Sequence, residues 1–141
     1  MKTKALALLL VLSLTGCAAL QDRVANFWLA RWDATEARLA ATALIRAQDT
    51  TEICAADTPQ KRQVRVTGRM EHAAKNLLAY SQTLPDDNRP VIAVAKNLSD
   101  SAAEFHKRAG EKMSRLYCEN KARNMVTMSQ QAIKAVQSKR K

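Results

Sequence analysis

Residues 60–84, QKRQVRVTGRMEHAAKNLLAYSQTL, carry the pattern that decides the fold class of this 141-residue chain. Apolar side chains recur there with 4-3-4-3-4 spacing, at Val66, Met70, Ala73, Leu77, Tyr80 and Leu84. That spacing places them on one face of an α-helix, the seam expected of a helix in a bundle. Thr58 is a suitable N-cap and Pro59 suits the first helical position, so the helix is predicted to begin there. Gly68 weakens a helix by ~1 kcal/mol relative to alanine, and it marks either a close approach by another backbone or a position at which glycine is merely tolerated.

A similar stripe precedes this helix, between residues 20 and 48. It is formed by Leu20, Val24, Trp28, Trp32, Leu39 and Ala43. Asp33 and Glu36 interrupt it with the form of a capping box, in which Asp33 is the N-cap. Residues 17–32 are therefore predicted to be either a tether or a separate first helix ahead of the domain.

Two further seams follow residues 85–90, a predicted turn in which Pro90 suits the start of a helix. The first seam comprises Val91, Ala95, Leu98, Ala102, Phe105, Ala109, Met113 and Leu116. The second comprises Cys118, Ala122, Met125, Ser129, Ala132 and Val136. The phase changes between them, because continuing the first seam would bury Asn120 and Arg123. Either the chain turns near residues 116–120, which we favour, or one long helix presents two apolar faces.

Composition supports helix throughout the chain. Glycine and proline number three each, and residues with high helix propensity dominate. We expect an all-α fold: an antiparallel helical bundle of three to four helices with one disulfide. One domain over residues 33–137 suits this length, followed by a frayed basic tail at 138–141.

The N-terminus has the layout of a secretory signal: two lysines, then an apolar run that is too short to span a bilayer. The run ends in Leu14-Thr15-Gly16-Cys17, which resembles the lipobox of bacterial lipoproteins. In that class the cysteine thiol receives a diacylglyceryl group, and the chain is cut just before it. The resemblance implies that residues 1–16 are a signal peptide and that Cys17 carries the lipid.

A lipid on Cys17 makes the expected protein membrane-anchored, since each buried acyl methylene contributes ~0.8 kcal/mol. In lipoproteins, Asp directly after the lipidated cysteine commonly retains the protein in the inner membrane. Ala18 follows here. The resemblance therefore implies the periplasmic face of a Gram-negative outer membrane.

Cys54 and Cys118 are the cysteines that remain once Cys17 carries lipid. Two thiols in an oxidising compartment most simply form a disulfide. In an up-down-up bundle, the end of the first helix and the end of the third lie at the same pole, which brings these cysteines together. A disulfide between Cys54 and Cys118 is predicted.

The chain is basic, with a formal charge of +10 of which the two signal lysines supply +2. Export makes nucleic acid an improbable partner and leaves anionic phospholipid, lipopolysaccharide phosphates or an acidic protein surface. Two basic rows fall at helical spacing: Arg62, Arg65 and Arg69, and then Arg108, Lys112 and Arg115. They are either solvated outer faces or docking ridges for anionic headgroups or an acidic partner.

Aromatic residues gather close to the predicted lipid. Phe27, Trp28 and Trp32 lie within six residues of one another. Tryptophans near a membrane often sit in the headgroup layer, although rings that fill a bundle core would give the same pattern. The core interpretation is favoured.

Catalytic motifs are missing from the sequence. His72 and His106 stand apart, without the spacing of a metal pair, and are interpreted as solvated surface residues. No nucleophile elbow or glycine-rich phosphate loop occurs. We expect no enzyme activity, no cofactor and no metal.

The lipobox, a mature chain of roughly 120 residues, four helices and one disulfide together resemble the plan of the small helical pilotins of secretion systems. In that family a groove between helices captures a segment of the secretin. The resemblance implies a binding or assembly adaptor for another envelope protein. The alternatives are a membrane-surface or envelope-stress lipoprotein that binds anionic lipid, lipopolysaccharide or peptidoglycan, and a phage or plasmid exclusion lipoprotein.

Overall fold

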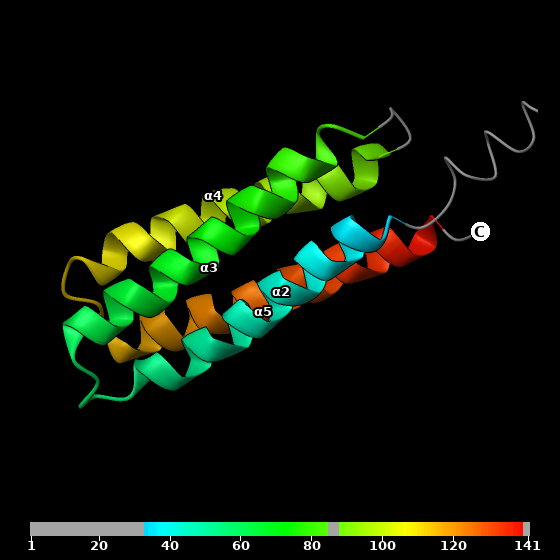
Figure 1. Cartoon of the computed structure of the whole chain (residues 1–141). Coiled ribbons are helices and arrows are strands. Elements are labelled where there is room, and N and C mark those ends of the chain that lie inside the picture. The colour runs from blue at the N-terminus through cyan, green and yellow to red at the C-terminus, as the bar shows by residue number, and fades with distance from the viewer. Residues whose placement is uncertain (1–32, 85–87, 140–141) are drawn as a thin grey trace, which may run out of the picture. The chain divides into compact units, whose positions relative to one another are not determined.

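The computed structural model describes residues 33–84 and 88–139, and within these ranges it holds helices and no strand. The long helices are α2 (Ala34–Thr51), α3 (Gln60–Ser81), α4 (Arg89–Ala109) and α5 (Arg115–Ser138), and a short 3-10 helix, η1 (Glu52–Cys54), follows α2. Figure 1 shows the four long helices alternating in direction. The prediction of an all-α antiparallel bundle is confirmed. The predicted signal peptide, Cys17, Phe27, Trp28 and Trp32 lie outside the described residues.

The helices pack as two close pairs. α3 packs most extensively against α4, and α2 against α5. Much of the core between them consists of small side chains: Ala40, Ala43, Ala47, Ala74, Ala95, Ala102, Ala122 and Ala132. Small residues let helix backbones approach closely, and larger buried side chains such as Phe105, Met70 and Leu98 fill the remaining core. The predicted seams therefore supply the core.

The start of α2 confirms one half of the capping prediction and corrects the other. Asp33 is the N-cap, and its Oδ1 accepts hydrogen bonds from the N–H groups of Thr35 at 2.8 Å and Glu36 at 3.0 Å. Glu36 does not complete a capping box. Its side chain is fully buried and its hydrogen bonds go to other helices.

The starts of α3 and α4 fall within one residue of the prediction. α3 begins at Gln60, with Pro59 at the N-cap and no side-chain cap, so Thr58 does not take the capping role predicted for it. α4 begins at Arg89 with Pro90 in its first turn. Proline is tolerated there because the first N–H groups of a helix have no partner within it.

The boundary between α4 and α5 differs from the prediction. The chain turns at residues 110–114 rather than near 116–120. Gly110 ends α4, and Ser114 caps α5 by accepting a hydrogen bond from the Tyr117 N–H at 3.2 Å. Leu116, placed on the core stripe by its spacing, is 67% exposed because it belongs to the next helix.

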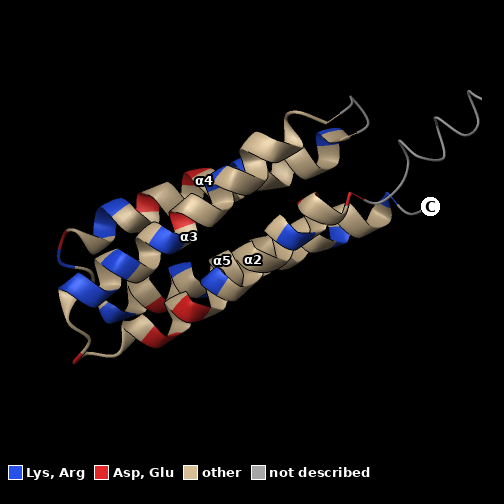
Figure 2. Ribbon diagram, viewed as in Figure 1, with Lys and Arg blue, Asp and Glu red and all other residues tan. Residues whose placement is uncertain are grey.

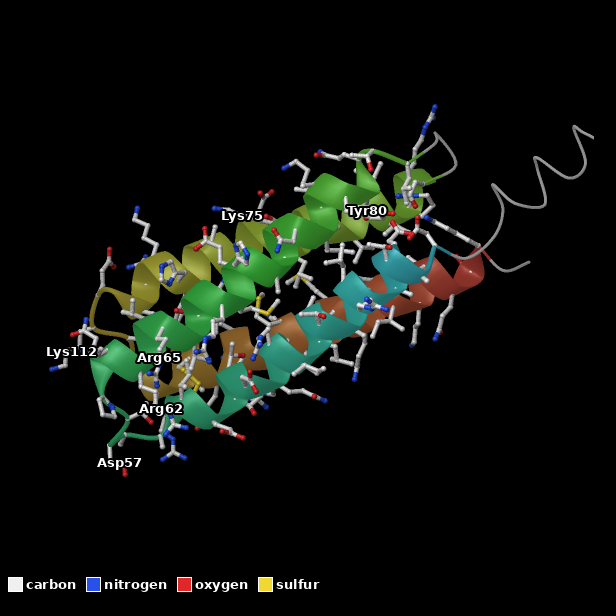
Figure 3. The ribbon with its side chains drawn as sticks, in the orientation of Figure 1. Asp57, Arg62, Arg65, Lys75, Tyr80 and Lys112 are labelled. Atoms are coloured by element: carbon white, nitrogen blue, oxygen red, sulfur yellow. A yellow bond between two sulfur atoms is a disulfide. The ribbon has the colours of Figure 1, made fainter. Side chains whose placement is uncertain are left out.

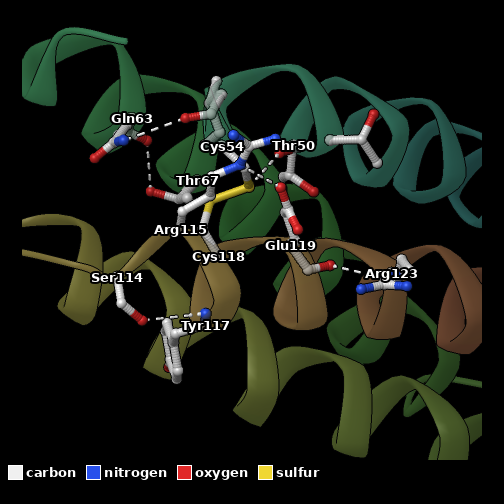
Figure 4. Close-up of a disulfide and its surroundings, with 12 residues drawn as sticks. Thr50, Cys54, Gln63, Thr67, Ser114, Arg115, Tyr117, Cys118, Glu119 and Arg123 are labelled. Carbon is white, nitrogen blue, oxygen red and sulfur yellow. Dashed lines mark hydrogen bonds and ion pairs between the residues drawn. A yellow bond between two sulfur atoms is a disulfide. The ribbon is translucent and has the colours of Figure 1, made fainter. Parts of the chain in front are cut away.

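The predicted disulfide is present (Figure 4). Cys54 ends η1 and Cys118 lies in the first turn of α5, with 5.4 Å between their Cα atoms. The bond joins one end of the α2–α5 pair, close to where α3 begins. The up-down-up arrangement thus brings the two cysteines together as expected.

The predicted basic tail begins later than expected. Ser138 is still helical, and Lys139 Nζ lies 2.6 Å from Glu36 Oε2. Lys139 is therefore part of the bundle, and residues 140–141 lie outside the described range.

Candidate functional site

An open groove of about 620 Å³ runs along the surface between α2 and α3. It is lined by Leu39, Thr42, Arg46, Val64, Arg65, Gly68, Arg69, His72, Ala73 and Asn76. On α2 these positions recur every three or four residues, and on α3 they form adjacent pairs that recur every four residues, so each helix contributes one face. A hollow of this size lies within the range of ligand sites in proteins.

Polar contacts close the α2–α3 seam at both ends of this groove. At one end Gln63 Nε2 donates a hydrogen bond to the carbonyl of Ile53 in η1 at 3.2 Å. At the other, the Tyr80 hydroxyl donates to Asp33 Oδ2 at 2.8 Å. The groove lies between these two contacts, both of which are made within the bundle itself. The groove is therefore a preformed feature of the bundle.

Glu36 organises the end of the bundle at which Asp33 lies. Its Oε1 accepts hydrogen bonds from Ser81 Oγ at 2.7 Å and Asn88 Nδ2 at 2.8 Å, and its Oε2 accepts one from Lys139 Nζ at 2.6 Å. Glu36 itself is fully buried. One carboxylate thus joins the start of α2, the end of α3, the residue before α4 and the end of α5.

Asp33 is held in its ionised form at the same end. Burial alone raises its pKa, but hydrogen bonds from the Glu36 N–H, the Tyr80 hydroxyl and the Thr35 N–H outweigh burial. The pKa of Asp33 consequently lies below its ordinary value. The shared hydrogen bond raises the pKa of Tyr80, because ionising the phenol would lose it.

The groove walls carry an excess of positive charge. Arg65 and Arg69 project from α3 and are exposed, and neither forms an ion pair with any residue in 33–84 or 88–139. Arg46 projects from α2 and pairs with Asp49 at 3.1 Å. His72 is exposed on the same face of α3. Three guanidinium groups therefore surround the groove, with one carboxylate beside them.

The three arginines of the first predicted basic row do not share one environment. Arg65 and Arg69 line the groove, whereas Arg62 lies 3.7 Å from Glu52. Figure 3 shows Arg62 and Arg65 on the first turns of α3 and Tyr80 at its opposite end. The prediction located two of the groove's cations. It missed Arg46. The spacing of Leu39, Thr42 and Arg46, three and four residues apart, places all three on one face of α2 and could have identified it.

The second predicted ridge is not a single helix face. Arg108 lies in the last turn of α4, Lys112 in the connecting turn, and Arg115 at the start of α5. Arg108 pairs with Glu111 at 3.1 Å and Arg115 with Glu119 at 2.7 Å, which raises the pKa of Arg115. These three residues were predicted to lie on one helix face because the turn at 110–114 was not recognised. These cations contribute to the basic end of the bundle visible in Figure 2.

His106 is not the solvated residue that was predicted. Its Nδ1 lies 3.0 Å from the hydroxyl of buried Thr67, and its Nε2 lies 3.9 Å from Glu71. The ring covers Gly68, where an added Cβ would lie 3.1 Å from His106 Cε1. The close approach expected at Gly68 thus exists, but a side chain makes it instead of a backbone.

The opposite seam, between α4 and α5, is crossed by side chains. Lys121 Nζ lies 2.5 Å from Glu104 Oε2, and Tyr117 donates a hydrogen bond to the same carboxylate at 3.4 Å. The hydrogen bond and charge of Lys121 lower the pKa of Glu104. Burial raises the pKa of Tyr117.

Residues 33–84 and 88–139 offer neither a membrane span nor a metal cluster. None of their helices is long and apolar enough to cross a membrane. The same residues contain no cluster of three or more His, Cys, Asp or Glu side chains placed to hold a metal ion.

Comparison with known proteins adds no relative. No protein-family model, curated protein or solved structure matches this chain.

Proposed function

We propose that this chain is a non-catalytic lipoprotein, anchored through Cys17 at the periplasmic face of the outer membrane, that binds another envelope protein. Its role is to help that partner assemble or reach its place, as a pilotin does. The observation that carries the proposal is the preformed groove between α2 and α3, which combines apolar and cationic side chains. Grooves of this kind receive segments of partner proteins.

The position of the groove supports a protein partner over the headgroups of the anchoring membrane. Asp33, the described residue closest in sequence to Cys17, contacts Tyr80 near the end of α3. Arg69 and Arg65 precede Tyr80 by 11 and 15 residues, roughly 16 to 22 Å along a helix. The groove's free cations thus lie away from the end at which the chain enters the bundle.

Anionic lipid, lipopolysaccharide or peptidoglycan is the second candidate ligand. The three groove guanidinium groups favour it, because arginine also binds phosphate groups with paired hydrogen bonds. The apolar floor of the groove is less suited to a headgroup. The third expectation, an exclusion lipoprotein, has no feature of the described bundle in its favour.

Anchoring is tested by Cys17→Ala. The variant is expected in the soluble periplasmic fraction, because without the lipid no acyl chain holds the protein on the bilayer. Cell fractionation with immunoblotting measures this, and Thr127→Ala serves as the control, because it changes an exposed residue of α5 and leaves Cys17 in place. Continued membrane association of Cys17→Ala would show that other groups hold the protein on the membrane.

Partner binding is tested by photo-crosslinking in intact envelopes. A photoreactive side chain at Thr42, inside the groove, is expected to give an adduct with an envelope protein. The same group at Thr127, exposed on α5, is the control and is expected to give none. The Thr42 adduct should disappear when Arg65 and Arg69 are both replaced by alanine. Absence of a protein adduct at Thr42, with flotation of the chain on anionic vesicles, would favour the lipid alternative.

A further inference from the structure

We propose that the occupant of the α2–α3 groove is an acidic amphipathic segment, with two carboxylates about one helical turn apart that bind Arg65 and Arg69. This inference rests on the proposed function, since it names the chemistry of the partner segment. It follows from three features of the groove: the free cations on one wall, the paired cation on the other, and the apolar floor between them.

The free cations set the charge and spacing of the occupant. Arg65 and Arg69 are four residues apart on α3, so their side chains lie on the same face about one turn apart. Neither has a carboxylate within salt-bridge distance in the ranges 33–84 and 88–139. Arginine pairs with a carboxylate through two parallel hydrogen bonds. Two carboxylates with a matching separation would satisfy both side chains.

The opposite wall reinforces the selection for negative charge. Arg46 is held by Asp49, and their side chains remain about two-fifths exposed, at 39% and 43%. An incoming carboxylate can share Arg46 without displacing a buried contact. A cationic occupant would instead meet three guanidinium groups, and repulsion of this kind excludes incorrect partners.

The floor requires an apolar component as well. Leu39 and Val64 are half-buried, and Ala73, which also lines the groove, is buried. Apolar side chains of the occupant would remove this surface from water, which favours binding. A purely ionic ligand such as phosphate would leave the floor exposed. A segment with acidic and apolar positions uses both parts of the groove.

The test uses the full chain in a non-ionic detergent and two fluorescent peptides of equal length. Both peptides carry the same leucine and alanine positions; their charged positions are all glutamate in one and all lysine in the other. Fluorescence anisotropy is expected to show binding of the glutamate peptide and none of the lysine peptide. Arg65→Ala/Arg69→Ala should weaken binding about tenfold or more, because two charge-assisted contacts are lost.

A matched control removes the same charge elsewhere. Arg115 and Arg123 are exposed on α5, outside the groove, so Arg115→Ala/Arg123→Ala should leave glutamate-peptide binding within about twofold of the original, since remote charges are screened. The inference is overturned if neither peptide binds, if both bind alike, or if the two double variants weaken binding equally. Equal competition by inorganic phosphate would identify a phosphate site instead.

Failure of this inference is distinguishable from failure of the proposed function. A protein adduct at Thr42 without glutamate-peptide binding would retain the adaptor and reject an acidic occupant. Glutamate-peptide binding without an adduct in envelopes would retain the groove's preference and reject the adaptor role.

Discussion

The environment of Glu36 differs from the one that its local sequence predicts. A glutamate three residues after Asp33 predicts a capping box, yet its carboxylate is fully buried and accepts hydrogen bonds from Ser81, Asn88 and Lys139. A buried carboxylate is costly unless it is paired and hydrogen-bonded, and here both conditions are met. Lys139 therefore holds the end of α5 against the start of α2.

Lys139→Met is expected to destabilise the bundle by about 3 kcal/mol, because it leaves the buried charge of Glu36 without its cation. Glu36→Gln added to this variant should recover part of the loss, since a neutral amide needs no counter-ion. Urea denaturation of the single and double variants measures both effects. A double variant less stable than Lys139→Met alone would contradict the pairing.

Asp33 gives the fold a dependence on acid pH. The pKa of Asp33 is lowered in the folded state. Its ionised carboxylate therefore adds to the free energy of unfolding above the unfolded-state pKa of about 3.9, and this contribution is lost as the pH falls through the folded-state pKa. Asp33→Asn should cost about 0.3 to 1 kcal/mol near pH 7, because it keeps a capping side chain but removes the negative charge from the N-terminus of α2, and this difference should shrink below about pH 4. Urea denaturation at several pH values checks the trend. A difference that does not change with pH would exclude the ionised carboxylate as its source.

At the scale of elements, the break between α4 and α5 was the main error of position. Gly110 adopts ordinary helical angles, with φ at −72°, and the apolar stripe continues in phase as far as Met113 and Leu116. Both signals are compatible with an uninterrupted helix. Ser114 caps the start of α5. A serine can take this role only where a helix begins, so it does not by itself predict the turn at 110–114.

Leu98 and Leu116 test this break because both belong to the same predicted stripe. Leu98→Ala should cost about 2 to 5 kcal/mol, since Leu98 is fully buried in α4. Leu116→Ala should stay within about 0.5 kcal/mol of the original, because most of that side chain is already in water. Thermal or urea denaturation compares them. Equal losses at the two positions would favour the long continuous helix.

At the scale of the whole molecule, the disulfide and the Glu36 cluster secure opposite ends of the bundle. Cys54 and Cys118 join the α2–η1 end to α5, across 64 positions of sequence. The cluster joins all four helix termini at the other end. The surface groove lies along the α2–α3 seam, between these two ends.

Cys54→Ser/Cys118→Ser should destabilise the protein by roughly 4 kcal/mol, the chain-entropy value for a closed loop of this length. The urea midpoint of the variant, compared with the unreduced protein, gives the size of the loss. Mass spectrometry of periplasm-derived protein without reductant should show the two cysteines linked. Two free thiols in that sample would remove the covalent link from the fold.

Much of the architecture was predictable because its causes are local. Helix propensity and the spacing of apolar residues determined the all-α class and the buried faces, since both depend on neighbours a few residues away. Asp33 was identifiable as a cap for the same reason. The resemblance of Leu14-Thr15-Gly16-Cys17 to a lipobox depends only on the identity of adjacent residues. The disulfide between Cys54 and Cys118 was predictable because two cysteines remain once Cys17 is assigned to the lipid.

The tertiary structure decided which faces meet. Arg46 joins Arg65 and Arg69 only because α2 packs beside α3, and Arg108 and Arg115 separate only because the chain turns between them. Glu36 becomes buried because four helix termini converge on it. Such contacts link residues distant in sequence and depend on the packing of whole helices. The helices and their apolar faces were therefore determined by the sequence alone, and the groove and its charge by their assembly.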